Sequence, residues 1–201
     1  VRAGSLSARD QRLLEVAVDQ LSRLTSLLNS MLDVSRVSSG QISLNRHALE
    51  ICAFTRRVVG EVQAGLEHHT IVTSIPLAPI LVLADDLRLE QVLQNLLNNA
   101  VKYSPGGGRI TVTLEQQGKD VCISLSDEGL GIPAANLPYL FQRFYRAETA
   151  DTRHIVGMGV GLAIAHEIVA LHDGRIEVES QEGVGSTFRV YLPILVQPAS
   201  S

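Results

Sequence analysis

The sequence predicts an α+β protein, a two-layer sandwich in which helices cover one face of a mixed sheet, preceded by one long helix. Three features carry this prediction. Segments that alternate apolar and polar residues occur in pairs, and separate segments have the 3.6-residue period of amphipathic helices. Residues 7–38 form one long helical pattern with few breaking residues. Paired strands combined with separate helices are typical of the α+β class.

The composition is that of an ordinary globular protein. The 201 residues are 45% hydrophobic and 19% charged, with a net charge of -4, so we expect one or two domains and no nucleic-acid partner. Cys52 and Cys122 lie in apolar stretches without metal-ligand spacing, which indicates buried free thiols. No apolar run reaches the roughly 18 residues that span a bilayer. We therefore expect a cytoplasmic chain, whose parent protein could still carry a membrane anchor.

The long first helix carries a strip of apolar residues close to a heptad repeat. Its members are Leu13, Ala17, Leu21, Leu24, Leu28 and Met31. Such a strip needs a partner helix. No second long helix adjoins it, so the partner is another copy, a segment outside this sequence, or the following domain. We predict a partial helical unit over residues 1–40, a second domain over 41–196 and a polar tail over 197–201.

The second domain is predicted to contain seven strands and four helices. The strands are predicted over residues 41–50, 70–75, 80–83, 109–116, 121–126, 175–180 and 185–192. The helices are predicted over residues 52–68, 91–104, 133–140 and 160–171. The four residues 117–120 predict a hairpin turn. Residues 146–156 are polar and lack a period, which predicts a mobile loop.

The helix over 91–104 carries three asparagines, Asn95, Asn98 and Asn99, opposite an apolar face. Asparagine is a mediocre helix former, because its amide competes with the backbone for hydrogen bonds. Asn95 and Asn99 are four residues apart and share a face, and Lys102 and Tyr103 follow one turn later. Such a set either holds a metal-bound phosphate and a base or forms a solvated polar face. The helix alone leaves both interpretations open.

Two glycine-rich segments interrupt the elements. Residues 127–132 read DEGLGI and follow a strand, where Asp127 can accept a hydrogen bond from an amine such as that of adenine. A plain turn is the simpler interpretation of this segment. Residues 157–162 read GMGVGL and precede a helix. Backbone N–H groups that run into a helix N-terminus can bind an anion. Neither a dinucleotide-binding fingerprint nor a P-loop occurs.

The order of these features resembles the ATP-binding catalytic domain of sensor histidine kinases, within the wider group of gyrase, Hsp90 and MutL ATPases. The resemblance runs through the asparagine helix, the D-x-G-x-G segment, the FQRF segment at 141–144, the polar loop, the G-x-G-x-G-L segment and the GSTF segment at 185–188. The earlier stretch LLNSMLDVSRVSSG is similar to the second helix of that family's dimerisation and phosphoacceptor hairpin.

This resemblance implies a site for ATP and magnesium. Asn99 would coordinate the magnesium ion and Asn95 would line the phosphate side. Lys102 would neutralise phosphate charge, Tyr103 would pack near the adenine, and Asp127 would accept from the adenine amine. Arg146 would act as a catalytic residue at the γ-phosphate. The resemblance also implies nucleotide-binding roles for Gly129, Gly131, Ile132, Arg143, Gly157, Gly159, Val160, Gly161, Leu162 and Thr187.

The residue at position 95 bears on whether the site would act as a kinase or as an ATPase. Members of the wider group that hydrolyse ATP resemble one another in placing a glutamate four residues before the metal-binding asparagine. Here Asn95 takes that place, and an amide cannot accept a proton from water near neutral pH. The resemblance therefore implies a kinase that passes the γ-phosphoryl group to a histidine and then to a response regulator. The alternatives are a degenerate nucleotide-binding module and a serine kinase or ATPase of the same fold.

Some family features are missing or changed. The acceptor histidine would lie on a first hairpin helix that this sequence lacks, since His166 and His172 fall in the helix after the polar loop. We expect a piece of a kinase, cut between the hairpin helices, or half of a split kinase, with a homodimeric parent. Glu128, Leu130 and Met158 also depart from the residues common in the family.

Overall fold

The computed structural model describes residues 9–10, 13–14, 17–18, 21, 43–147 and 158–196. The chain divides into two compact units, Val1–Ile42 and Ser43–Ser201. Most of the predicted loop over 146–156, Gly157, the predicted helix end at residues 38–40 and the tail over 197–201 lie outside the described residues. Among the helices that are described, none is both long and apolar enough to pass through a bilayer.

In the first unit, the described residues are helical, as the sequence predicts. Four of them are apolar side chains that are 50–63% exposed, namely Leu13, Leu14, Val18 and Leu21. The remainder of the predicted helix over 7–38 lies outside the described residues. The partner of this apolar strip stays a prediction.

The second unit is built on a mixed five-stranded sheet with the strand order β2-β4-β5-β7-β6. These strands are β2 (His69–Ser74), β4 (Gly108–Gln117), β5 (Asp120–Asp127), β6 (Arg175–Gln181) and β7 (Gly185–Pro193). β2 runs parallel to β4, and every other pair is antiparallel. A separate ribbon pairs β1 (His47–Glu50) with β3 (Leu81–Ala84).

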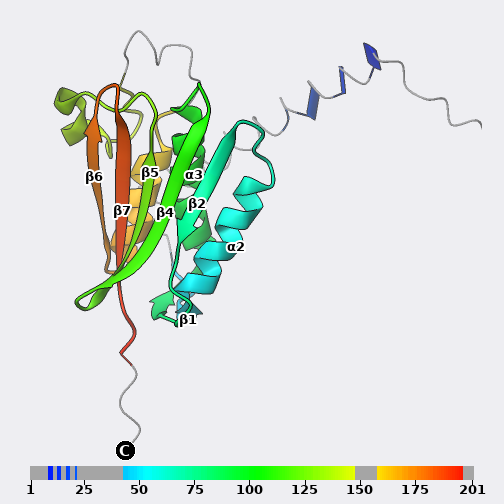
Figure 1. Cartoon of the computed structure of the whole chain (residues 1–201). Coiled ribbons are helices and arrows are strands. Elements are labelled where there is room, and N and C mark those ends of the chain that lie inside the picture. The colour runs from blue at the N-terminus through cyan, green and yellow to red at the C-terminus, as the bar shows by residue number, and fades with distance from the viewer. Residues whose placement is uncertain are drawn as a thin grey trace, which may run out of the picture. The chain divides into compact units, whose positions relative to one another are not determined.

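Three α-helices form the second layer, behind the sheet in the view of Figure 1. They are α2 (Ile51–Gln63), α3 (Asp86–Lys102) and α4 (Gly161–Leu171), and a short 3-10 helix, η1, spans Ala134–Tyr139. Side chains alternate along β5 and β7, and Ile123, Leu125 and Val190 are buried, as are Leu97 of α3 and Ile168 of α4. The predicted α+β fold class is confirmed.

Several element boundaries differ from the sequence prediction. Of the strand expected over 41–50, the described residues 43–50 form only His47–Glu50. The strand ends where predicted, at Glu50, which caps α2 by accepting from the backbone N–H groups of Cys52 and Ala53. The helix expected to reach residue 68 ends at Gln63. The helix expected over 133–140 is a 3-10 helix that contains Pro138, which has no N–H to donate.

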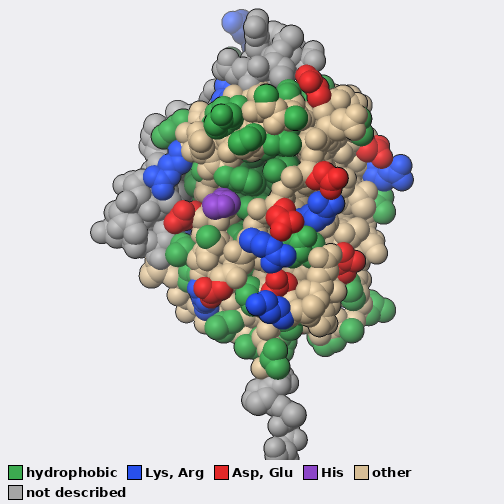
Figure 2. Space-filling view, turned by 90° about the vertical axis from the view of Figure 1, so that its left-hand side faces the viewer, with side chains coloured by type: hydrophobic (Ala, Val, Ile, Leu, Met, Phe, Trp, Pro, Cys, Tyr) green, Lys and Arg blue, Asp and Glu red, His purple; other side chains and the backbone are tan. Residues whose placement is uncertain are grey.

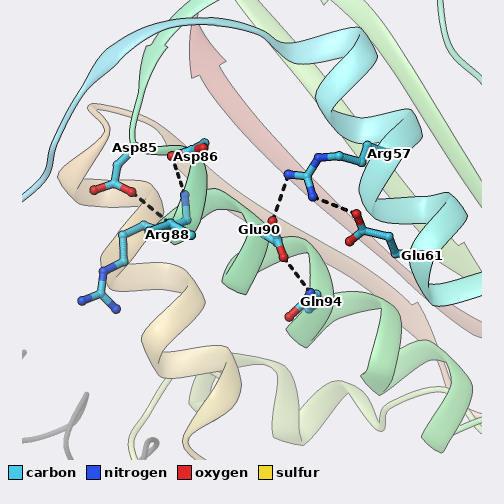
Figure 3. A network of polar contacts seen from close by, with 8 residues as sticks. Arg57, Glu61, Asp85, Asp86, Arg88, Glu90 and Gln94 are labelled. Atoms are coloured by element: carbon cyan, nitrogen blue, oxygen red, sulfur yellow. Dashed lines mark hydrogen bonds and ion pairs between the residues drawn. The ribbon is translucent and has the colours of Figure 1, made fainter.

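Polar contacts fix the outer side of α3, as Figure 3 shows. Asp85 is the N-cap and accepts from the Arg88 backbone N–H at 3.1 Å. Further along the helix, Glu90 accepts from Arg57 of α2 at 2.9 Å and from Gln94 at 3.1 Å. Of these three contacts, the exposed Arg57–Glu90 pair joins α3 to α2, and such a pair contributes little energy by itself.

A buried histidine joins the N-terminal end of α3 to the C-terminal end of α4. The Asp85 N–H donates to His172 Nε2 at 3.0 Å, and His172 Nδ1 lies 2.7 Å from the Ile168 carbonyl. His172 is only 2% exposed, and burial lowers its pKa. The neutral imidazole therefore links the two helices at this end.

The edge strand β6 is protected by charge. Arg175 pairs with Glu177 and with Asp120, and Arg189 of β7 pairs with Glu179 of β6. Figure 2, which views the side on which β6 lies, shows acidic and basic side chains interspersed below a patch of apolar ones. Charged edges oppose strand pairing with another chain.

Candidate functional site

The three asparagines of helix α3 differ in their burial. The helix buries one face through Leu89, Val92, Leu93, Leu96, Leu97 and Ala100. Asn95 and Asn99 border that face and are half-buried, whereas Asn98 is exposed. Asn98 therefore belongs to a solvated polar face. Asn95 and Asn99, which share another face of the helix, could take part in a binding site.

Asn95 contacts the first residue of α4. Its Nδ2 donates to the Gly161 carbonyl at 3.3 Å. A side chain at Gly161 would begin 3.4 Å from the Asn95 Oδ1, which is ordinary contact. The start of α4 therefore lies directly beside α3 at Asn95, so Gly161 of the glycine-rich segment lies next to that asparagine.

Lys102 and Arg146 bring two positive charges together at the end of α3. Burial lowers the pKa of Lys102, and the positive charge of Arg146 lowers it further. Burial raises the pKa of Tyr103, and Arg146 opposes that shift, so Arg146 lies near the tyrosine as well. The Lys102 ammonium is 5.0 Å from the centre of the Tyr103 ring. Two neighbouring cations favour an anion between them.

Gly159 holds the Arg146 segment in place. It adopts a φ of +70°, and a Cβ there would lie 2.4 Å from the Tyr145 carbonyl oxygen and 3.1 Å from Arg146 Cγ. Only glycine fits this approach. Val160 is buried and caps α4, while Arg143 is exposed. The structure therefore brings Gly159 and Arg146 together, and Gly157 lies outside the described residues.

Asp127 ends β5 as a buried carboxylate that is 8% exposed. Its Oδ1 accepts from the Gly129 N–H at 3.0 Å, and the Ser186 N–H also donates to this carboxylate. Burial raises the pKa of Asp127, and these two donors offset part of the rise. A buried carboxylate with few donors is well suited to accept from a ligand amine.

The glycines of the 127–132 segment are required by the protein's own backbone. A Cβ at Gly129 would lie 2.3 Å from the Tyr103 carbonyl oxygen, and a Cβ at Gly131, where φ is +65°, would lie 2.0 Å from the Gln181 carbonyl oxygen. The Leu130 N–H donates to the Tyr103 carbonyl at 2.9 Å, and the Ile132 N–H donates to Ser180 Oγ at 2.8 Å. The segment therefore joins the end of α3 to the β6–β7 hairpin.

Thr187, to which the resemblance assigns a nucleotide-binding role, does not lie beside Asp127. It pairs with Ser126, and their hydroxyl oxygens are 2.9 Å apart on the outer face of the sheet. Side chains alternate along a strand, so Thr187 and Asp127 project from opposite faces. Ser186 pairs with Asp127 instead and is buried.

Two serines near Asp127 were missed by sequence reasoning. Ser186 depends on the register of β5 with β7, which no local pattern reveals. Ser104 lies just beyond α3, at the end of the helix predicted over 91–104, and a Cβ at Gly129 would lie 2.5 Å from its hydroxyl oxygen. Only the fold places these residues beside the carboxylate.

Comparison with known proteins identifies the family to which the chain belongs. Residues 84–196 match the family model described as histidine kinase-, DNA gyrase B-, and HSP90-like ATPase. Sensor histidine kinase WalK of Bacillus subtilis is 36% identical in an alignment of 185 residues that covers 90% of this chain and 30% of the relative. Circadian input-output histidine kinase CikA of Thermosynechococcus vestitus is 35% identical in an alignment of 202 residues, gaps included, that covers 97% of this chain and 27% of the relative.

Solved structures agree with the sequence relatives. Full-length ShkA in complex with AMPPNP has a TM-score of 0.76 and 28% identity, covering 98% of this chain and 41% of that one. The Acinetobacter baumannii histidine kinase AdeS has a TM-score of 0.73 and 25% identity, covering 95% of this chain and 87% of that one. The chain spans less than a third of the length of the two sequence relatives. It belongs to the histidine kinase-, DNA gyrase B- and HSP90-like ATPase family, as an ATP-binding domain of the sensor histidine kinase type.

Proposed function

We propose that this chain is the catalytic part of a sensor histidine kinase, which binds magnesium-ATP and donates the γ-phosphoryl group to a histidine. That histidine would lie on a helix outside this sequence, in the same parent chain or in the second copy of a homodimer. Residues 1–40 would supply part of the dimerisation hairpin. The histidine would then pass the group to the receiver domain of a response regulator. The relatives named as sensor histidine kinases support this reaction.

The observation that carries the proposal is the amide at position 95. Asn95 donates to the Gly161 carbonyl at 3.3 Å, so its Nδ2 is directed to the protein and no carboxylate stands at this position. An amide cannot take a proton from an attacking water. A site without that base favours retention of ATP until a better nucleophile arrives, which is what a kinase requires.

The residues fit a magnesium-bound nucleotide. No group of three or more His, Cys, Asp or Glu side chains in the described ranges could hold a metal by itself. The half-buried Asn99 of α3 would offer an amide oxygen as a protein ligand to a cation whose other ligands are phosphate and water oxygens, as is usual for magnesium. When bound, magnesium would supply neutralising charge to the transferring phosphoryl group.

The chain's own residues would position the nucleotide around that ion. Lys102 would neutralise phosphate charge, and Arg146 would stabilise the negative charge that develops on the γ-phosphoryl group during transfer, with Arg143 assisting. Asp127 would accept from the adenine amine, beside Tyr103. Because ATP is supplied inside the cell, we expect this domain to act on the cytoplasmic side of any membrane.

The test is a titration of the whole chain with magnesium-ATP, with ADP release followed in the same sample. We expect binding with almost no steady-state ADP release. The Asn95→Glu variant restores a carboxylate and should raise ADP release by about 10²-fold or more, the usual contribution of a general base. Sustained release by the unaltered chain would favour an ATPase, and absence of ATP binding would refute the proposed function.

A further inference from the structure

One buried hydroxyl in the described part of the chain has no hydrogen-bond partner, that of Ser104. The residue is 4% exposed. Its backbone is fully used, since its N–H donates to the Val101 carbonyl at 3.3 Å and its carbonyl accepts from Gly107 N at 3.0 Å and His69 Nε2 at 2.8 Å. Of the polar groups of Ser104, the hydroxyl is therefore the one without a hydrogen-bond partner among the described residues. A buried hydroxyl without a partner is destabilising and calls for an explanation.

The position of this hydroxyl points to Asp127. A Cβ built on Gly129 would lie 2.5 Å from Ser104 Oγ and 2.9 Å from Asp127 Oδ1. The two oxygens are therefore no further apart than the sum of these distances, which is within the span of one bridging water. A side chain at position 129 would clash with both oxygens and with the Tyr103 carbonyl oxygen, so only glycine permits this close approach. By contrast, the hydroxyl of the other buried serine, Ser186, is 3.0 Å from Ser180 Oγ.

We propose that Ser104 is a positioning residue of the adenine site, which donates its hydroxyl proton to a buried water shared with the Asp127 carboxylate. This inference rests on the proposed function, because Ser104 can affect ligand binding in this way only if Asp127 accepts a hydrogen bond from a ligand amine. The water would satisfy the unpartnered hydroxyl and hold the carboxylate in one orientation. Burial raises the pKa of Asp127, and two backbone N–H donors offset part of that rise. A further hydrogen-bond donor would stabilise the ionised carboxylate.

The test compares Ser104→Ala with the unaltered chain in calorimetric titrations with magnesium-ATP and magnesium-ITP, whose base has an oxygen in place of the amine. Loss of one hydrogen bond should weaken ATP binding by about threefold to tenfold. ITP binding should change much less, because no amine depends on the Asp127 orientation. The acid limb of ATP binding should move to higher pH, since the carboxylate loses a stabilising donor.

Two controls separate this role from a structural one. Ser124→Ala removes a half-buried hydroxyl from the outer face of β5 and should leave nucleotide binding unchanged. The melting temperature of unliganded Ser104→Ala should change little, because within the described residues the hydroxyl has no protein partner to lose. A lower melting temperature, or equal losses of ATP and ITP affinity, would mean a packing role and would overturn the inference.

A parallel titration of Asp127→Asn distinguishes the inference from the proposed function. If Asp127→Asn weakens ATP binding while Ser104→Ala does not, the serine role is wrong and the adenine assignment stands. If neither variant changes ATP binding, the adenine assignment fails and the serine role fails with it. If both weaken it, the double variant should lose less than the sum of the two losses, as expected for groups that share one water.

Discussion

Asp127→Asn is the most informative single change in the candidate site. The carboxylate has one oxygen engaged by the Gly129 N–H at 3.0 Å, and the Ser186 N–H also donates to the group. A ligand amine needs a further acceptor position on the same carboxylate. Asparagine offers one oxygen and one NH₂ group, so either the backbone donors or the amine must then face a donor.

The expected loss can be estimated from this geometry. A hydrogen bond to a charged acceptor contributes about 1.5–3 kcal/mol, so magnesium-ATP affinity should fall by about 10- to 150-fold. The unliganded protein should respond in the opposite direction. Burial raises the pKa of Asp127 above its unfolded value, so ionisation at neutral pH weakens folding. Asparagine removes this cost, and its advantage should disappear as the pH falls below the unfolded carboxyl pKa.

The assay is calorimetric titration with magnesium-ATP, together with melting temperatures measured across pH. Asp120→Asn is the matched control, because Asp120 begins the same strand and pairs with Arg175 at 2.8 Å at the opposite end. It should leave ATP affinity unchanged. An unchanged ATP affinity in Asp127→Asn would refute the adenine assignment, as would an equal loss of affinity for ITP.

Two further predictions concern the γ-phosphate and pH. Arg146→Ala should slow phosphoryl transfer to a separately supplied acceptor hairpin by about 10²- to 10³-fold while ATP affinity falls far less. Equal losses in single-turnover transfer and in affinity would assign Arg146 to ground-state binding. Burial lowers the pKa of His172 below its unfolded value of about 6.5, so the free energy of unfolding should decrease as the pH falls below that value. His172→Gln should reduce this decrease between pH 7 and 5 in chemical denaturation, and an unchanged pH dependence would contradict the role of the neutral imidazole.

Local sequence patterns were sufficient for most of the framework. The apolar period of α3 comes from residues close together in the chain, and the structure confirms it. The β4–β5 hairpin is also local, since Gly118 supplies the positive φ of 63° that its turn requires. The end of α2 was predicted wrongly, because apolar Leu66 continues the helical pattern beyond Gln63, where the helix ends.

The sequence by itself determined the family resemblance, the fold class and the residue types at the site, because motif order and periodicity are properties of neighbouring residues. Only the tertiary structure decided which of those residues meet. The register of β5 with β7 places Ser186 beside Asp127 and turns Thr187 to the other face. The packing of α4 on α3 brings Gly161 to Asn95, and the close approach at Gly129 brings Ser104 to the buried carboxylate. These contacts join residues that lie up to 66 positions apart, so they depend on how the layers pack rather than on any local pattern.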